Sequence, residues 1–205
     1  MAKDYELKIL GIVGSPRIEG NTRILVEEAL KAAAESYDAK TELILLAGKK
    51  IEPCTACGKC YGTGECEIND DANSIVKKFL EYDGIILGSP VYMGTVTAQL
   101  KALMDRTTVF KTVKGSKLKN KVGGGIAVGL GRSGGQETTL RTMHDFFLTH
   151  DMIVVGDGTK YGGTAVAFAA GEVRGDELGL KLSRKLGRRV AEVAGYIKKA
   201  SLTKG

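Results

Sequence analysis

Apolar segments that look like strands alternate along this chain with segments of helical period, five times in succession. The first apolar run, 7–15, is continuous and ends in Gly and Ser, as expected of a parallel strand buried on both faces. Similar runs follow at 41–47, 84–92, 121–130 and 152–157, with helical segments at 21–39, 72–82, 97–107, 136–151 and roughly 175–200. Strands and helices that alternate through short connections favour a doubly wound α/β sheet. We therefore expect five parallel strands with helices on both faces.

The size and apolar content of the chain fit one domain covering residues 1–205. The 205 residues are 43% hydrophobic, enough for one core. No apolar run approaches the ~18 residues that a membrane span needs, and the charged N-terminal stretch does not resemble a signal peptide. We expect no membrane association and a reducing, cytoplasmic setting.

The net charge of +6 is concentrated in two segments, 110–121 and 181–200. In both, basic residues alternate with apolar ones, as on the solvated face of a helix, and no aromatic stacking platform accompanies them. We therefore do not expect a nucleic-acid partner. The excess charge suits an acidic redox partner or an anionic ligand instead.

Three loops carry unusual residues where strands are expected to end, which is where such sheets bind ligands. In loop 1 (14–23), Ser15, Asn21 and Thr22 offer side-chain donors, and Arg17 adds a fixed positive charge. The loop leads into a helix N-terminus, whose free N–H groups favour an anion. We expect a phosphate site here. An ordinary turn with Asn21 as the helix cap is the plainer alternative.

Loop 2 (89–97) opens the segment 89–106. Pro90 fixes the backbone just past a buried strand, and Gly94 permits a close approach. Tyr92 and Met93 offer flat or soft surface to an aromatic ring. Alternatively, these two side chains cap the core.

Loop 3 (129–137) contains Gly129, Gly131 and Gly134 in the order G-x-G-x-x-G, with Asp157 further along. This matches the dinucleotide-binding fingerprint, but it follows the fourth strand, whereas the phosphate-loop features follow the first. We interpret loop 3 as a glycine-rich loop that packs beside a bound ring.

All the cysteines of the chain lie in one short segment, the Cys loop (51–71), at positions 54, 57, 60 and 66. Thiolates at i, i+3 and i+6 wrap around one compact object, as in the C-x2-C-x2-C run of bacterial ferredoxins. In ferredoxins the fourth cysteine binds a second cluster, which this chain has no cysteines to complete. Cys66 would therefore close the same [4Fe–4S] cluster as Cys54, Cys57 and Cys60.

Structural zinc and a thiol–disulfide switch are the alternatives for the Cys loop. Zinc commonly takes four cysteines, though usually as two pairs separated by a longer gap. Four crowded thiolates repel one another unless a metal is present.

The remaining ionisable residues carry weaker signals. We expect His144 and His150 to be surface or packing residues, and Asp105 and Arg106 to form a structural ion pair or a partner contact near the ligand. No Ser–His–Asp set or carboxylate pair suited to hydrolysis is evident.

Taken together, the motifs resemble a known family. "GSPRIEGNT" (14–22) resembles the phosphate-loop signature of the NADPH-dependent FMN reductase branch of the flavodoxin-like superfamily, and "SPVYMGTVTAQLKALMDR" (89–106) resembles its second flavin-contacting segment. The compact motif Cys54-x2-Cys57-x2-Cys60-x5-Cys66, inserted after the second strand, is similar to that of the iron–sulfur flavoproteins.

This resemblance implies a flavodoxin-like fold that binds FMN and an iron–sulfur cluster. The phosphate would lie on residues 15–22 and the isoalloxazine ring against 90–95 and 131–135. The implied contacts are Ser15, Arg17, Asn21, Thr22, Pro90, Val91, Tyr92, Met93, Gly94, Gly131, Ser133 and Gly134. The resemblance also implies a homodimer or homotetramer with flavin sites near the subunit interfaces.

The expected function is that of an oxidoreductase. Electrons would pass from a donor such as ferredoxin through a [4Fe–4S] cluster to FMN, and on to O2, H2O2 or a quinone. The cofactors would supply the chemistry, so no side chain need act as acid or base. The alternatives are an NAD(P)H-dependent FMN or quinone reductase with a zinc-stapled Cys loop, and a non-catalytic electron carrier or redox sensor.

Overall fold

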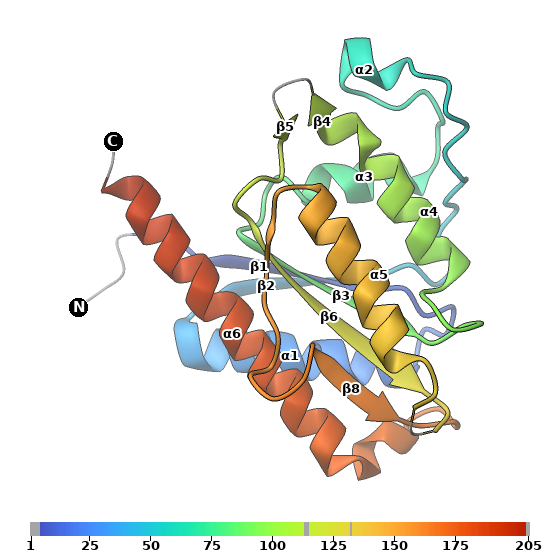
Figure 1. Ribbon diagram of the computed structural model, residues 1–205, viewed down its shortest axis with the longest axis vertical. Helices are drawn as coiled ribbons and strands as arrows, with labels where there is room; N and C mark the ends of the chain where they lie inside the picture. The colour runs from blue at the N-terminus through green and yellow to red at the C-terminus, as the bar shows by residue number, and fades with distance from the viewer. Residues whose placement is uncertain (1–4, 113–114, 132, 204–205) are drawn as a thin grey trace.

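The apolar runs form strands of one parallel sheet in the computed structural model, which describes residues 5–112, 115–131 and 133–203. The sheet contains β1 (Lys8–Val13), β2 (Lys40–Leu45), β3 (Gly84–Pro90) and β6 (Val122–Gly129), in the order β2-β1-β3-β6 (Figure 1). In β1, Leu10 and Ile12 join one buried cluster and Ile9 and Val13 the other. The strand is thus buried on both faces, which is why it reads as an unbroken apolar run.

The fifth position of the sheet is shared by two short strands. β7 (Ile153–Val154) pairs with the start of β6, and β8 (Gly163–Val166) pairs with its end. Between them the chain turns at Asp157, whose Oδ1 atom accepts the N–H groups of Thr159 and Lys160, both at 2.6 Å. The expected doubly wound sheet is confirmed, with its fifth strand interrupted by this turn.

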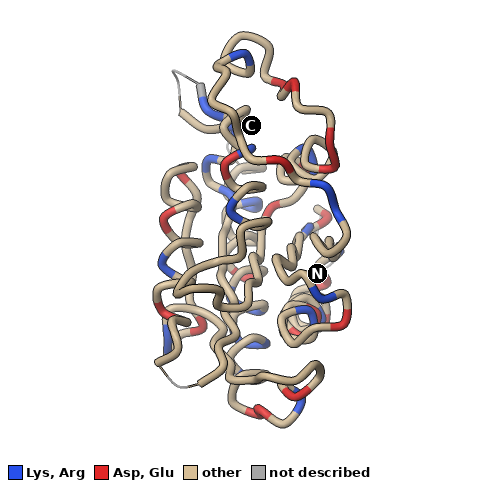
Figure 2. Tube along the Cα trace, turned by 90° about the vertical axis from the view of Figure 1, so that its right-hand side faces the viewer, with Lys and Arg blue, Asp and Glu red and all other residues tan. Residues whose placement is uncertain are grey.

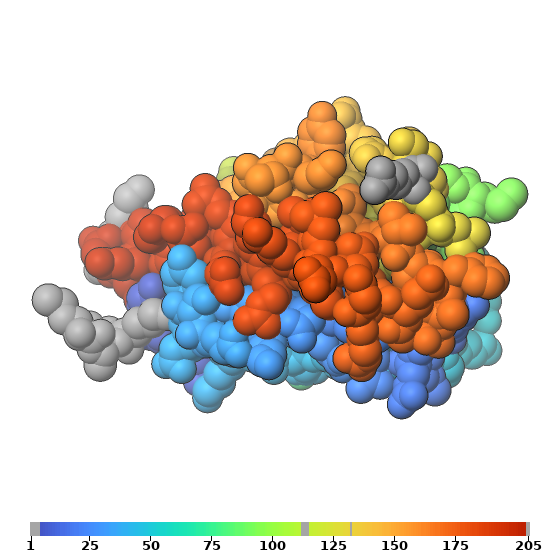
Figure 3. Space-filling view, turned by 90° about the horizontal axis from the view of Figure 1, so that it is seen from below, coloured from blue at the N-terminus to red at the C-terminus, as the bar shows by residue number. Residues whose placement is uncertain are grey.

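Helices cover both faces of the sheet. α1 (Asn21–Tyr37) and α6 (Glu177–Leu202) lie on one face, and α3 (Asp71–Lys78), α4 (Ala98–Arg106) and α5 (Gln136–Thr149) on the other (Figure 1). α1 and α6 lie side by side across the surface shown in Figure 3. They approach closely because residue 187 of α6 is glycine: a Cβ there would collide with the backbone of Ala29 in α1.

Several short elements escape prediction because they are too short for a hydrophobic pattern to repeat within them. They are α2 (Cys60–Thr63), the 3-10 helices η1 (Thr107–Phe110) and η2 (Glu172–Gly175), and the antiparallel pair β4 (Lys111–Thr112) and β5 (Gly115–Ser116). α2 belongs to the Cys loop and packs beside η1.

Basic and acidic residues are interspersed along the chain (Figure 2). The basic segment 181–200 lies within α6, where Arg184 pairs with Glu28 and Glu35, and Lys198 with Asp83. These partners fit the interpretation of 181–200 as a solvated helix face. No helix in the described ranges combines the length and the apolar character that a bilayer span requires.

His150 is buried at the end of α5 and has a hydrogen-bond partner for each ring nitrogen. The Thr107 hydroxyl donates to the carbonyl of Met104, so its oxygen accepts from His150 Nε2 at 2.8 Å. Nδ1 then accepts from the hydroxyl of Ser116 at 2.7 Å, while the Ser116 oxygen accepts the N–H of Leu118. This order of donors assigns the neutral tautomer protonated at Nε2. His150 is a packing residue, as predicted.

We expect acid to destabilise the protein through His150. Burial, and to a smaller extent Lys111, lowers the pKa of His150 to about 4, with Asp151 opposing the shift. An unfolded chain takes up this proton near pH 6.5, so the stabilising contribution is complete above that pH and is lost as pH falls from 6.5 to 4. Between pH 7 and pH 5 the free energy of unfolding should drop by about 2 kcal/mol.

Urea unfolding at these two pH values would measure the drop. The control is His150→Gln, which cannot titrate and should lack this part of the pH dependence. An equal pH dependence in both proteins would contradict the assignment.

Candidate cofactor sites

The three predicted loops meet at one edge of the sheet, because β1, β3 and β6 are neighbours and run in the same direction. The Thr97 hydroxyl in loop 2 donates to the carbonyl of Gly14 in loop 1 at 2.6 Å. The Thr138 hydroxyl in α5, just after loop 3, donates to the carbonyl of Gly94 in loop 2, also at 2.6 Å. The loops are therefore joined into one surface, as the sequence predicts.

Loop 1 presents a set of donors suited to an anion. Ser15 is buried, and its Oγ atom accepts the N–H of Arg17 at 3.1 Å. α1 starts at Asn21, so the first N–H groups of the helix have no acceptor within the helix. The Arg17 guanidinium lies at the same loop and donates to the carbonyl of Phe168 at 3.2 Å. These residues fit a phosphate group.

One prediction for loop 1 is wrong: Asn21 is not the helix cap. Gly20 occupies the N-cap position, with no side-chain cap bond. Asn21 is the first helical residue, and its side chain instead reaches the segment after β8. It donates to the carbonyl of Ala169 at 2.8 Å and accepts the N–H of Val173 at 3.3 Å. Asn21 therefore fastens that segment over loop 1, and its contact with phosphate stays a prediction.

Loop 2 lifts two side chains away from the core. Tyr92 and Thr95 exchange backbone hydrogen bonds of 2.9 and 3.1 Å around Met93 and Gly94, whose φ values of 47° and 82° are left-handed. This geometry is that of a tight type I′ turn. Tyr92 is 48% exposed and Met93 fully exposed, so the alternative that they cap the core is wrong. Both remain free to contact a flat ring.

Loop 3 closes on itself through Gln136, the first residue of α5. The Gln136 side chain donates to the carbonyl of Gly131 at 2.8 Å and accepts the N–H of Gly134 at 2.9 Å. Asp157 is buried and holds the turn between β7 and β8. A dinucleotide site would need an acidic side chain free to meet the ribose, so these contacts favour the interpretation of loop 3 as a packing loop.

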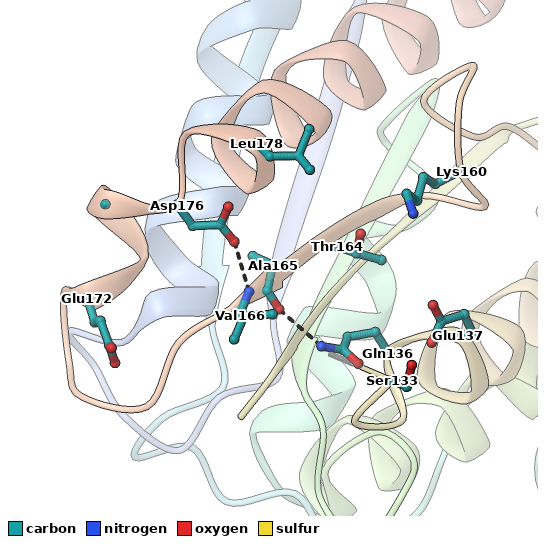
Figure 4. Close-up of a pocket in the computed structure, with 11 residues that line it drawn as sticks. Ser133, Gln136, Glu137, Lys160, Thr164, Ala165, Val166, Glu172, Asp176 and Leu178 are labelled. Atoms are coloured by element: carbon teal, nitrogen blue, oxygen red, sulfur yellow. Dashed lines mark hydrogen bonds between the residues drawn. The ribbon is translucent and has the colours of Figure 1, made fainter. Parts of the chain in front are cut away.

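A hollow of about 930 Å³ adjoins loop 3 (Figure 4). It lies between α5, β8 and the start of α6, and Ser133 and Gln136 form part of its wall. Gln136 donates to the carbonyl of Ala165 at 3.4 Å, and Asp176 accepts the N–H of Val166 at 2.9 Å (Figure 4). The hollow is large enough for a small organic molecule.

The Cys loop surrounds a smaller cavity. The four cysteines, together with Ile68 and Thr108, line a space of about 90 Å³. Cys54 and Cys57 are exposed, and Cys60 and Cys66 half-buried. Among the described residues, no three His, Cys, Asp or Glu side chains meet closely enough to bind a single metal ion.

Left-handed residues coil the Cys loop tightly around this cavity. Ala56 and Gly58 have φ values of 54° and 76°, and the N–H of Ala56 donates to Cys54 Sγ at 3.5 Å. Burial raises the pKa of the Cys60 thiol, and the other three thiols add to the rise. A set of four cysteine sulfurs on one cavity is a donor set that iron–sulfur clusters and structural zinc use.

The ends of the Cys loop are fastened by Arg106, the last residue of α4. Its guanidinium forms a two-pronged ion pair with Asp70 at 2.7 and 3.0 Å, with both side chains fully buried. It also donates to the carbonyls of Glu52 at 3.0 Å and Ile68 at 3.1 Å, on either side of the cysteines, and to the Asn73 side chain at 2.8 Å.

This ion pair differs from the expected one. We expected Asp105 and Arg106 together near the ligand, but Asp105 pairs with Lys101 at 2.7 Å. Burial alone would lower the pKa of Arg106; Asp70 and, less strongly, Cys66 raise it. Burial would also raise the pKa of Asp70, but Arg106 holds it below its ordinary value. Asp70 caps α3 by accepting the N–H of Ala72. Its place just before a helical segment is the feature of the sequence that could have pointed to this residue.

Comparisons with known proteins agree with this geometry. Residues 7–167 match the family model of the NADPH-dependent FMN reductases. An iron–sulfur flavoprotein of Methanocaldococcus jannaschii is 54% identical over 196 residues, covering 94% of this chain and 100% of that protein. An iron–sulfur flavoprotein of Methanosarcina thermophila is 39% identical over 94% of this chain and 98% of its own length. A solved flavodoxin from the domain Archaea, 15% identical, superposes with a TM-score of 0.59 over 94% of this chain and 99% of its own, which confirms the flavodoxin-like fold.

Proposed function

Since the chain belongs to the iron–sulfur flavoproteins of the NADPH-dependent FMN reductase family, we propose that it carries electrons from a donor protein through a [4Fe–4S] cluster to FMN. It is an FMN-dependent oxidoreductase. Ferredoxin is the proposed donor, and O2, H2O2 or a quinone the proposed acceptor. The observation that carries the proposal is the cavity lined by all four cysteines of the chain.

The proposed cluster ligands are Cys54, Cys57, Cys60 and Cys66. When bound, the cluster would supply single-electron transfer. The chain's own part is structural: the left-handed residues Ala56 and Gly58 turn the sulfurs toward one cavity. Arg106, through its ion pair with Asp70 and its bonds to the carbonyls of Glu52 and Ile68, forms a clamp that keeps both ends of the loop in place.

FMN would lie across the joined edge of loops 1, 2 and 3. The donors of loop 1 would hold the phosphate, and the exposed Tyr92 and Met93 would contact the ring. The full set of proposed contacts is Ser15, Arg17, Asn21, Thr22, Pro90, Val91, Tyr92, Met93, Gly94, Gly131, Ser133 and Gly134. The hollow beside Ser133 would admit the small acceptor.

The remaining proposals concern the assembly. We propose that residues 1–205 act as one FMN-binding domain in a cytoplasmic homodimer or homotetramer, without a nucleic-acid partner.

Anaerobic purification followed by assays for iron, acid-labile sulfide, zinc and FMN tests the function directly. About four irons, four sulfides and one FMN per chain would support it. One zinc per chain with FMN and no sulfide would replace it with an NAD(P)H-dependent FMN or quinone reductase, because four cysteines also suit structural zinc. Turnover of a small acceptor would separate an enzyme from an electron carrier or redox sensor.

Thr22→Val should weaken FMN binding and leave the iron content unchanged. Thr22 is buried in the first turn of α1, and valine keeps its shape while removing the hydroxyl donor. Losing one hydrogen bond to a charged phosphate should raise the FMN Kd about tenfold or more. Fluorescence titration of FMN into apoprotein measures the Kd. The control is Thr41→Val, at an exposed position of β2; an unchanged Kd for Thr22→Val would remove Thr22 from the phosphate site.

A further inference from the structure

We propose that Arg106 is a positioning residue that raises the reduction potential of the cluster, by directing its Nε–H and its positive charge at Cys66. The inference rests on the proposed [4Fe–4S] cluster. It goes beyond the clamp described above, which accounts for two of the three nitrogens of the guanidinium.

The third nitrogen is the first observation. Arg106 Nε is buried and has no hydrogen-bond partner among the described residues, whereas Nη1 and Nη2 make five hydrogen bonds. A buried donor left without a partner destabilises the fold. Arginine at a well-packed position normally uses all its donors, so an unused one indicates a missing acceptor.

The position of Cys66 supplies that acceptor. Arg106 and Cys66 line the same cavity of about 80 Å³, together with Asn73 and Phe110. Cys66 also lines the cavity shared by the four thiols. Cys66 therefore borders both the cluster site and the cavity that Arg106 lines. Hydrogen bonds and positive charge at a ligating sulfur favour the more negative, reduced cluster and so raise its potential.

The last observation is that the Arg106 guanidinium is rigidly held. It is fixed by the Asp70 carboxylate and by the carbonyls of Glu52 and Ile68. It cannot turn toward another partner without breaking these bonds. The guanidinium, and with it the Nε–H group, is thus held in place before any cluster is present, which is what separates a tuning role from a chance contact.

Removing the guanidinium and removing only its counter-charge should move the potential in opposite directions. The double variant Arg106→Gln with Asp70→Asn keeps a neutral, hydrogen-bonding pair and removes both charges. It should disfavour reduction of the cluster at least tenfold, which is about 59 mV for one electron. Asp70→Asn alone leaves the guanidinium charge uncompensated and should favour reduction. Asn73→Ala loosens the same loop without changing a charge and should shift the equilibrium less than tenfold.

A redox titration of the anaerobic holoprotein, followed by electron paramagnetic resonance, measures these shifts. Shifts of the same sign in all three variants, or no shift in the double variant, would overturn the proposal and leave a structural clamp. If the double variant assembles no cluster, the Asp70→Asn variant tests the proposal by itself. A cluster potential in that variant at or below that of the unmodified protein would overturn the proposed role of Arg106. Iron, sulfide and zinc are assayed in the unmodified protein first. Zinc in place of iron and sulfide would contradict the proposed function. A full cluster whose potential shifts differ from those expected would contradict only the inference about Arg106.

Discussion

Replacing Cys57 by Ala should empty the Cys loop of iron and acid-labile sulfide and leave FMN bound at one per chain. Cys57 is an exposed residue on the wall of the thiol cavity, so its removal takes away a ligand without opening the core. Clusters of this type are held by four thiolates, so the variant lacks one of the ligands that assembly needs. The FMN loops lie at the other end of α4 and do not depend on this thiol (Figure 1).

Thr55→Ala is the matched control, because Thr55 lines the same cavity and contributes no thiol. It should retain iron and sulfide at the level of the unmodified protein. Visible spectra together with iron, sulfide and flavin assays on both variants give the result. Loss of iron and FMN together in Cys57→Ala would show that the Cys loop is needed for the fold as a whole, and would contradict its role as an independent cluster site.

The largest loss of stability should come from Gly187→Val in α6. A Cβ at residue 187 would meet the backbone of Ala29 rather than a flexible side chain, so the two helices must separate. Overpacking of this kind costs about 3 kcal/mol or more when backbone has to move. For a domain of this size, that corresponds to a fall in Tm of roughly 10 °C.

Gly195→Ala on the same helix provides the contrast. The nearest atom to a Cβ there is Tyr5 Oη at 3.5 Å, an ordinary contact. The gain in helix propensity should raise the free energy of unfolding by up to about 1 kcal/mol. Thermal and urea unfolding of both variants test the pair. A similar effect of the two substitutions would mean that the close approach of α1 and α6 is not what residue 187 provides.

The sheet could be predicted from the sequence because β1, β3 and β6 are buried almost throughout and leave long apolar runs, and the edge strand β2, although partly exposed, still ends in the apolar residues of 43–45. The fifth strand could not be predicted in detail. β7 has two residues, and the turn at Asp157 depends on that side chain accepting the N–H groups of Thr159 and Lys160. A hydrophobic pattern contains no trace of such a turn.

The thiol cavity was foreseeable for a similar reason, since its four cysteines lie close together in the sequence. The clamp that holds it was not, because Arg106 meets Asp70 across 36 positions of the chain. Asn21 illustrates the same limit. Its residue type suits a cap, but a distant segment at Ala169 and Val173 takes its side chain, and local sequence says nothing of that contact.

The clamp at Arg106 also bears on how a cluster could be gained by a flavodoxin-like protein. Contacts from both ends of the Cys loop meet at one side chain of α4, through Glu52, Ile68 and Asp70. The two ends also meet each other, where the N–H of Asp71 donates to the carbonyl of Lys50 at 3.0 Å, and a segment whose ends lie together can be exchanged as a unit. Residues 51–73 and the arginine at position 106 would then form a transplantable module, and a cluster-free FMN reductase that received both parts would have the means to hold it.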